Sequence, residues 1–203
     1  MATALLAYLA SRQKLLLWLI WNLSLAMVPL LVSSLIGAVR KKRTAIVAPL
    51  IAIWLLFLPN AFYVATDLIH LSRLEFLSVN AVTTTITYYE NFNGYVALLV
   101  LFAGAMLALI AGVMSVADIH KLMIEQKWTR KARAITLIAI FGLTGYGLYL
   151  GRFLRLNSWD ILNPMKIFDE VIGSFGPFTL KISALFAIYV AASYIFYKKV
   201  LKK

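Results

Sequence analysis

The fold class of this chain is decided by residues 94–116, which read GYVALLVLFAGAMLALIAGVMSV without a single charged side chain. About 20 consecutive apolar residues are enough for a helix to cross the hydrocarbon core of a bilayer. The whole chain agrees, because 63% of its residues are hydrophobic and its mean hydropathy is +0.87. Strands of a membrane barrel would show short alternating segments instead. We therefore predict an all-α integral membrane protein.

Four other apolar runs accompany this one, and together they predict a compact bundle of about five transmembrane helices in a single domain, residues 1–203. The predicted spans are 15–39, 44–58, 94–116, 134–150 and 178–197. Pro59 is expected to end the second span, because proline cannot donate a backbone hydrogen bond within a helix. The second and fourth spans are short, so either their helices continue into the polar segments that follow or the protein is locally thin.

Two segments are expected to contact the membrane in other ways. Residues 1–13 are predicted to form an N-terminal interfacial helix ahead of the first span. Residues 72–89 include the β-branched and aromatic stretch TTTITYY, but open strand edges do not survive in lipid. We therefore expect a re-entrant or interfacial helix there, or a sixth, partial span.

The net charge of +12 comes from basic residues that gather in the short gaps between apolar runs. This distribution is typical of membrane orientation and of attraction to anionic headgroups, and we expect no nucleic acid partner. The positive-inside rule places the basic residues of 40–43 and 121–133 in the cytoplasm, with the N-terminus outside and the C-terminus inside. Cysteine is absent, which excludes disulfides and thiolate metal sites.

Two short polar segments, 59–70 and 151–160, follow the second and fourth spans and are predicted to face the extracytoplasmic side. In the first segment, Asp67 and His70 are three residues apart and share a helix face with Tyr63. A carboxylate beside an imidazole can do acid–base chemistry or bind a metal. The same pair can also be structural, with His70 in the headgroup region.

The second polar segment contains Arg152 and Arg155, an i, i+3 pair suited to clamp a phosphate or carboxylate. Alternatively, both arginines extend to lipid headgroups. Asn157 and Asp160 add donors and acceptors directly after them, and Asp160 could instead neutralise one arginine. Asn60, in the first segment, either occupies a turn or hydrogen-bonds across helices.

A third carboxylate, Glu90, is expected on the same outer face. Together with Asp67, Asp160 and His70 it would make an oxygen-rich metal site if the four side chains converge. The sequence itself identifies no metal and no cofactor. On the cytoplasmic side, Asp118 lies among basic neighbours and is interpreted as one half of an exposed salt bridge.

Several stretches of the chain resemble the bacterial multi-pass membrane family catalogued as domain of unknown function 1361. They are WLLFLPNA at 54–61, TDLIHL at 66–71, YLGRFLR at 149–155, NSWD at 157–160 and NLSLA at 22–26. The chain departs from the family pattern at Phe62, Leu156 and Glu90, where proline, tryptophan and aspartate are expected. The resemblance implies a bacterial multi-pass membrane protein and implies no reaction.

Three functions from different classes remain open. In the leading interpretation, a protein of the bacterial cytoplasmic membrane binds or modifies an anionic lipid or lipid-linked intermediate. Arg152 and Arg155 would hold the anionic group, and Asp67, His70 and Glu90 would supply acid–base or metal chemistry in an enzyme. The alternatives are a small transporter or channel subunit and a non-catalytic accessory subunit with a membrane-protein partner. A transport pathway is disfavoured because the third span is almost free of polar residues.

Overall fold

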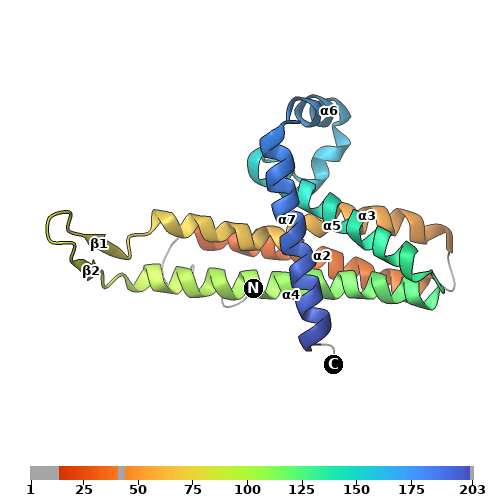
Figure 1. Cartoon of the computed structure of the whole chain (residues 1–203), viewed down its shortest axis with the longest axis horizontal. Helices are drawn as coiled ribbons and strands as arrows, with labels where there is room; N and C mark the ends of the chain where they lie inside the picture. Colours follow the sequence, from red (N-terminus) through yellow and green to blue (C-terminus); the bar gives the residue numbers. More distant parts are fainter. Residues whose placement is uncertain (1–13, 41–43, 202–203) are drawn as a thin grey trace.

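The computed structural model of the protein describes residues 14–40 and 44–201, and it is almost entirely helical (Figure 1). The long helices are α2 (Lys14–Val39), α3 (Thr44–Thr66), α4 (Phe92–Glu125), α5 (Arg130–Phe153) and α7 (Pro177–Phe196). The shorter elements are the 3-10 helices η1 (Asp67–Arg73) and η2 (Ser158–Leu162), strands β1 (Leu77–Val79) and β2 (Ile86–Tyr88), helix α6 (Pro164–Gly173) and the π-helical turn η3 (Tyr197–Leu201). The interfacial helix predicted at 1–13 lies outside the described residues.

Within the described part of the chain, 5 helical segments are long and apolar enough to cross a membrane. They are Leu17–Val39, Ala45–Arg73, Phe92–Glu125, Arg130–Phe153 and Pro177–Val200. The predicted membrane class and the predicted number of spans are therefore confirmed. The second and fourth spans reach beyond 44–58 and 134–150, so their helices do continue into the polar segments.

Helices α2, α3 and α4 run along the long axis of the molecule, and α2 packs on both of the others (Figure 1). Helix α5 lies obliquely against α3, while α7 crosses the bundle steeply and packs mainly on α5. A Cβ atom at Gly145 would overlap the backbone oxygen of Ser183, so only glycine permits this approach of α5 to α7. Small residues commonly allow such close packing between membrane helices.

Helix α3 continues through Pro59, so the prediction that this proline ends the second span is wrong. Proline removes one backbone donor and crowds the preceding turn. The carbonyl that loses its donor is that of Leu55, four residues earlier. The next two carbonyl oxygens of the turn accept from side chains: Ser158 Oγ donates to Leu56 at 3.2 Å, and Asn60 Nδ2 to Phe57 at 3.1 Å. Proline is more frequent in membrane helices than in soluble ones.

Residues 72–89 do not form the expected re-entrant or interfacial helix. They lead from η1 into an antiparallel hairpin in which Leu77 pairs with Tyr88 and Val79 with Ile86. The β-branched and aromatic residues favour strands. Because the hairpin projects past the ends of α3 and α4 (Figure 1), its open edges lie beyond the apolar helices, and the objection that strand edges do not survive in lipid does not apply.

Candidate functional site

A cavity of about 1250 Å³ lies where α3 and α5 end, and it brings the two polar segments together. Its walls come from α2, α3, η1, α5, η2 and α6. The polar side chains that line it are Asn22, Asn60, Tyr63, Asp67, His70, Ser72, Arg73, Arg152, Arg155, Asn157 and Ser158. Side chains that are far apart in sequence therefore share one site.

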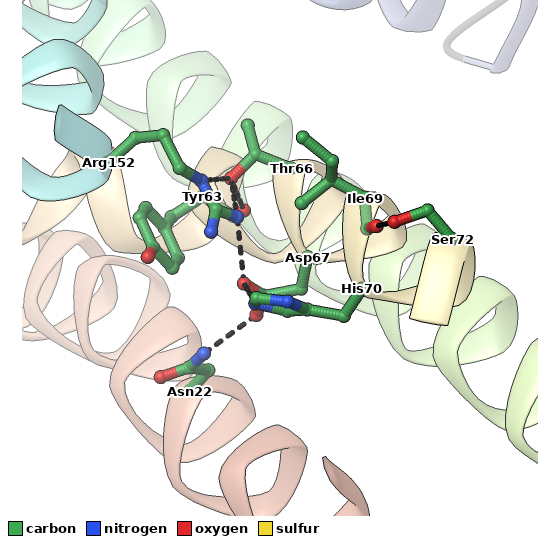
Figure 2. Close-up of polar contacts among 8 residues, drawn as sticks. All are labelled: Asn22, Tyr63, Thr66, Asp67, Ile69, His70, Ser72 and Arg152. Atoms are coloured by element: carbon green, nitrogen blue, oxygen red, sulfur yellow. Dashed lines mark hydrogen bonds and ion pairs between the residues drawn. The ribbon is translucent and has the colours of Figure 1, made fainter. Parts of the chain in front are cut away.

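Asp67 lines this cavity with its carboxylate fully engaged (Figure 2). Arg152 Nη2 donates to Oδ1 at 2.8 Å, and Asn22 Nδ2 donates to Oδ2 at 2.7 Å. Only 6% of Asp67 is exposed, and a buried charge is costly unless it is paired and hydrogen-bonded. Because both oxygens have partners, Asp67 is arranged to position Arg152 and is not a free base.

Arg152 is fixed from several directions by the end of α3. Its Nε and Nη2 atoms donate to Thr66 Oγ1 at 3.0 and 2.5 Å, and its guanidinium carbon lies 4.5 Å from the centre of the Tyr63 ring. The Thr66 hydroxyl in turn donates to the Tyr63 carbonyl at 2.6 Å. A guanidinium over an aromatic ring is attracted by the ring's negative face, more strongly where water is excluded. Arg152 is thus a structural cation with little freedom to move.

His70 lies one 3-10 turn after Asp67, since three residues per turn place i and i+3 on the same face. Its Nε2 atom is 3.9 Å from Asp67 Oδ1, which is an ion-pair distance and too long for a hydrogen bond. Figure 2 shows the imidazole ring beside the carboxylate, with Arg152 above it and Asn22 below it. The side chain is 30% exposed and lines the cavity, so the imidazole is accessible to a ligand.

Arg155 is arranged differently from Arg152, and the expected helical clamp is wrong. Helix α5 ends at Phe153, so the two arginines do not share a helix face. Arg155 has φ = 56°, a left-handed conformation that residues with a side chain rarely adopt. Its side chain is exposed in the cavity lining and, among the described residues, has no hydrogen bond or ion pair.

The remaining predicted site residues have structural contacts. Asn60 Nδ2 also donates to Ser158 Oγ at 2.9 Å, which ties α3 to η2. The backbone N–H of Asn157 donates to Asp160 Oδ2 at 2.6 Å, so Asp160 caps the start of η2. Glu90 is exposed after the hairpin and is not part of the cavity lining.

The structure does not assemble the metal site considered from the sequence. Within the described residues, no group of three or more His, Cys, Asp or Glu side chains could hold a metal ion. Asp67 and His70 are adjacent, but Glu90 and Asp160 have the separate positions given above. Carboxylate ligands must converge to bind a hard cation. The positions of these four residues in the sequence could not show that their side chains stay apart.

Four polar residues of the site were not singled out from the sequence: Asn22, Thr66, Ser72 and Arg73. Asn22 had a usable signal, because a polar side chain inside an apolar span is costly unless it has a partner. Thr66 bonds Arg152, and Arg73 lines the cavity, but neither has a distinguishing sequence pattern.

The apolar part of the lining is rich in exposed tryptophan. Trp18, Trp21 and Trp159 all line the cavity and are exposed. The rings of Trp21 and Trp159 meet edge to face with centres 6.1 Å apart, which links α2 to η2. Tryptophan is enriched at membrane–water interfaces, where one side of the ring is apolar and the N–H is hydrated.

A family model described as "Protein of unknown function (DUF1361)" matches residues 21–193 and so confirms the resemblance seen in the sequence. The matched range includes all the described lining residues of the cavity except Trp18 and Leu19. Neither a curated protein nor a solved structure matches the chain.

Proposed function

We propose that this chain, which belongs to the family described as protein of unknown function DUF1361, binds the anionic group of a lipid or lipid-linked intermediate in its cavity. The observation that carries the proposal is the exposed, unpaired Arg155 in the cavity lining of the described structure. A guanidinium presents several N–H donors in a plane, which fits phosphate and carboxylate groups. An anionic ligand would give Arg155 the partner that the described protein groups do not.

The charge of the lining supports an anionic ligand. Arg152 is neutralised by Asp67, whereas Arg73 and Arg155 are both exposed in the lining. The cavity therefore keeps a positive charge that is available to a ligand. Electrostatic attraction is strengthened where the surroundings exclude water.

The mixed character of the lining supports an amphiphilic ligand. Exposed Trp18, Trp21 and Trp159 adjoin the polar groups in the same cavity. A ligand with an anionic head and an apolar chain would match both parts, since apolar surface is stabilised when it leaves water. A small inorganic anion would use only the polar part.

In this proposal the cavity faces the extracytoplasmic side of a bacterial plasma membrane, with the N-terminus outside and the C-terminus in the cytoplasm. The support is the distribution of basic residues: Arg40 and Arg130, at the end of α2 and the start of α5, lie at the opposite end of the bundle from the cavity. Basic residues accumulate on the cytoplasmic side of membrane proteins.

The residues expected to be catalytic have other roles in a binding site. Asp67 is a positioning residue, because Arg152 and Asn22 occupy its oxygens. For chemistry on a bound ligand, His70 offers an imidazole in the lining that can donate or accept a proton. Glu90 lies outside the lining and takes no part.

Native mass spectrometry of the detergent-purified protein tests this proposal. We expect the parent to retain phosphatidylglycerol in preference to phosphatidylcholine, and Arg155→Ala to lose that preference. Arg130→Ala is the matched control, because it removes the same charge from an exposed site at the other end of α5. If Arg155→Ala retains phosphatidylglycerol as well as Arg130→Ala does, the proposal is overturned. Glycerol phosphate added in excess distinguishes a site for the headgroup alone from a site for the whole lipid. At a site that binds the headgroup alone, glycerol phosphate would displace the lipid.

A non-catalytic accessory subunit is the second candidate, and the hairpin favours it. Because side chains alternate along a strand, one face of the hairpin is apolar, and all of its members are exposed. They are Leu77, Val79, Ile86 and Tyr88. Exposed apolar patches mark contact sites, so a partner that copurifies with the parent and is lost from a Val79→Ser/Ile86→Ser variant would favour this function.

A further inference from the structure

Helix α6 has an exposed apolar stripe, and it was not predicted from the sequence. Met165, Phe168 and Ile172 follow one another at spacings of three and four residues, which places them along one face of the helix. All three are exposed, with Met165 at 71%. Ile167 and Val171 lie about 130° and 90° around the helix from the middle of the stripe; both are half-buried, and Ile167 lines the cavity. The stripe therefore points away from the protein.

The stripe continues on both sides of α6 and does not end with it. Leu162 precedes the helix and Phe175 follows it, and both are exposed. Beyond them, exposed Phe178 and Leu180 open the apolar surface of α7, which is long and apolar enough to cross the membrane. The exposed apolar residues of α6 are thus followed along the chain by those of a helix that is long and apolar enough to cross a membrane.

Helix α6 runs across the directions of the long helices (Figure 1). Figure 1 shows α6 nearly end-on, whereas α2, α3, α4 and α7 are seen along their lengths. Residues 154–163 and 174–176 join it to α5 and α7, so it stays close to the ends of two spans. Amphipathic helices that lie in the interface bury their apolar face at the boundary of headgroups and acyl chains.

We infer that Met165, Phe168 and Ile172 insert into the headgroup–acyl boundary of the bilayer, so that α6 is an interfacial helix. Glu170 stands about 160° around the helix from the stripe, at 100° per residue, and is half-buried on the side that faces the protein. Because Ile167 lines the cavity, α6 separates the cavity from the neighbouring lipid. The inference does not depend on what the cavity binds.

Labelling with a fluorophore tests this placement directly, because the chain contains no cysteine. Phe168→Cys and the matched Glu170→Cys are labelled separately with a polarity-sensitive fluorophore and reconstituted in phosphatidylglycerol–phosphatidylcholine vesicles. Spin-labelled lipids carry the quencher either just below the headgroup or near the chain end, and iodide is the aqueous quencher. We expect the label at 168 to be quenched most by the shallow spin label, and the label at 170, on the other side of the helix, to be quenched less by it.

Two results would overturn the inference. A label at 168 quenched by iodide and not by lipid would place α6 in water. A label at 168 insensitive to both quenchers would place it against protein, as in a second copy of the chain. Met165→Cys and Ile172→Cys repeat the measurement, so one poorly folded variant does not decide the result, and each variant must show the parent's thermal unfolding midpoint.

Discussion

Both ends of the helix bundle hold an ion-pair cluster, but at the cavity end the pair shares its cavity with an exposed arginine. At the cavity end, Asp67 and Arg152 satisfy each other while Arg155 has no ion pair among the described residues. At the opposite end, Arg40 and Lys121 both pair with Glu125. The comparison separates charged groups that hold the helices together from one that is available to a ligand.

The end of the bundle opposite the cavity also shows how a polar group inside an apolar bundle finds a hydrogen-bond partner. Asp118 is half-buried and accepts a hydrogen bond from Ser33 Oγ at 2.9 Å, so its interpretation as an exposed salt bridge is wrong. His120 Nδ1 and the Tyr194 hydroxyl lie 2.5 Å apart and link α4 to α7. These contacts join helices and lie outside the cavity lining, so their roles are structural.

The largest expected effect is the loss of the buried pair at the cavity end. Asp67→Ala leaves Arg152 as a half-buried cation without an ion-pair partner, which we expect to cost about 2–3 kcal/mol of unfolding free energy. Denaturant unfolding in mixed micelles measures it. Asp67→Ala/Arg152→Ala should recover part of the loss, because the stranded charge is gone. A single variant as stable as the parent would show that the pair is not structural.

Close packing at the floor of the cavity gives the next effect. A Cβ at Gly147 would lie 2.5 Å from Pro59 Cγ, so Gly147→Ala must push α5 away from α3, at about 1–3 kcal/mol. A Cβ at Gly142, in the same helix, would have no neighbour within 4 Å, and Gly142→Ala should instead stabilise by about 0.5–1 kcal/mol. The same unfolding measurement tests both variants. If both change the unfolding free energy in the same direction, the close contact between α5 and α3 is contradicted.

At the end of the bundle opposite the cavity, we expect removal of one hydroxyl to lower the unfolding free energy and to leave ligand binding unchanged. Ser33→Ala takes the donor from Asp118, at a cost of about 1 kcal/mol because the carboxylate is only half-buried. Ser193→Ala is the control, since that hydroxyl bonds the Tyr189 carbonyl of its own helix. We expect both variants to retain phosphatidylglycerol as the parent does. Loss of the lipid from Ser33→Ala would mean that the contacts at this end affect binding in the cavity.

The smallest expected stability effect belongs to Arg155, and its sign is informative. Glycine adopts φ = 56° without the steric cost that arginine has, so Arg155→Gly should raise the unfolding free energy by up to about 1 kcal/mol. A residue kept in an unfavourable conformation at a cavity is typical of functional strain. Destabilisation by this variant would mean that Arg155 has a structural contact.

The sequence was sufficient for features that depend on local composition, and insufficient for those that depend on distant partners. Apolar run length predicted the five spans within the described chain. The hydrogen bond from Ser158 to the Leu56 carbonyl, beside Pro59 in α3, could not be predicted, because the two residues are 102 positions apart. For the same reason, the i, i+3 spacing of Arg152 and Arg155 did not show that one pairs with Asp67 and the other is open.

The central claim is that Arg155 contacts an anionic ligand while Arg152 supports the structure. Thermal unfolding in nanodiscs of phosphatidylcholine, with and without phosphatidylglycerol, tests it most directly, since a ligand that binds only the folded protein raises the midpoint. We predict that phosphatidylglycerol raises the midpoint of the parent and of Arg130→Ala, and leaves that of Arg155→Gly unchanged. An equal rise in Arg155→Gly would contradict the claim.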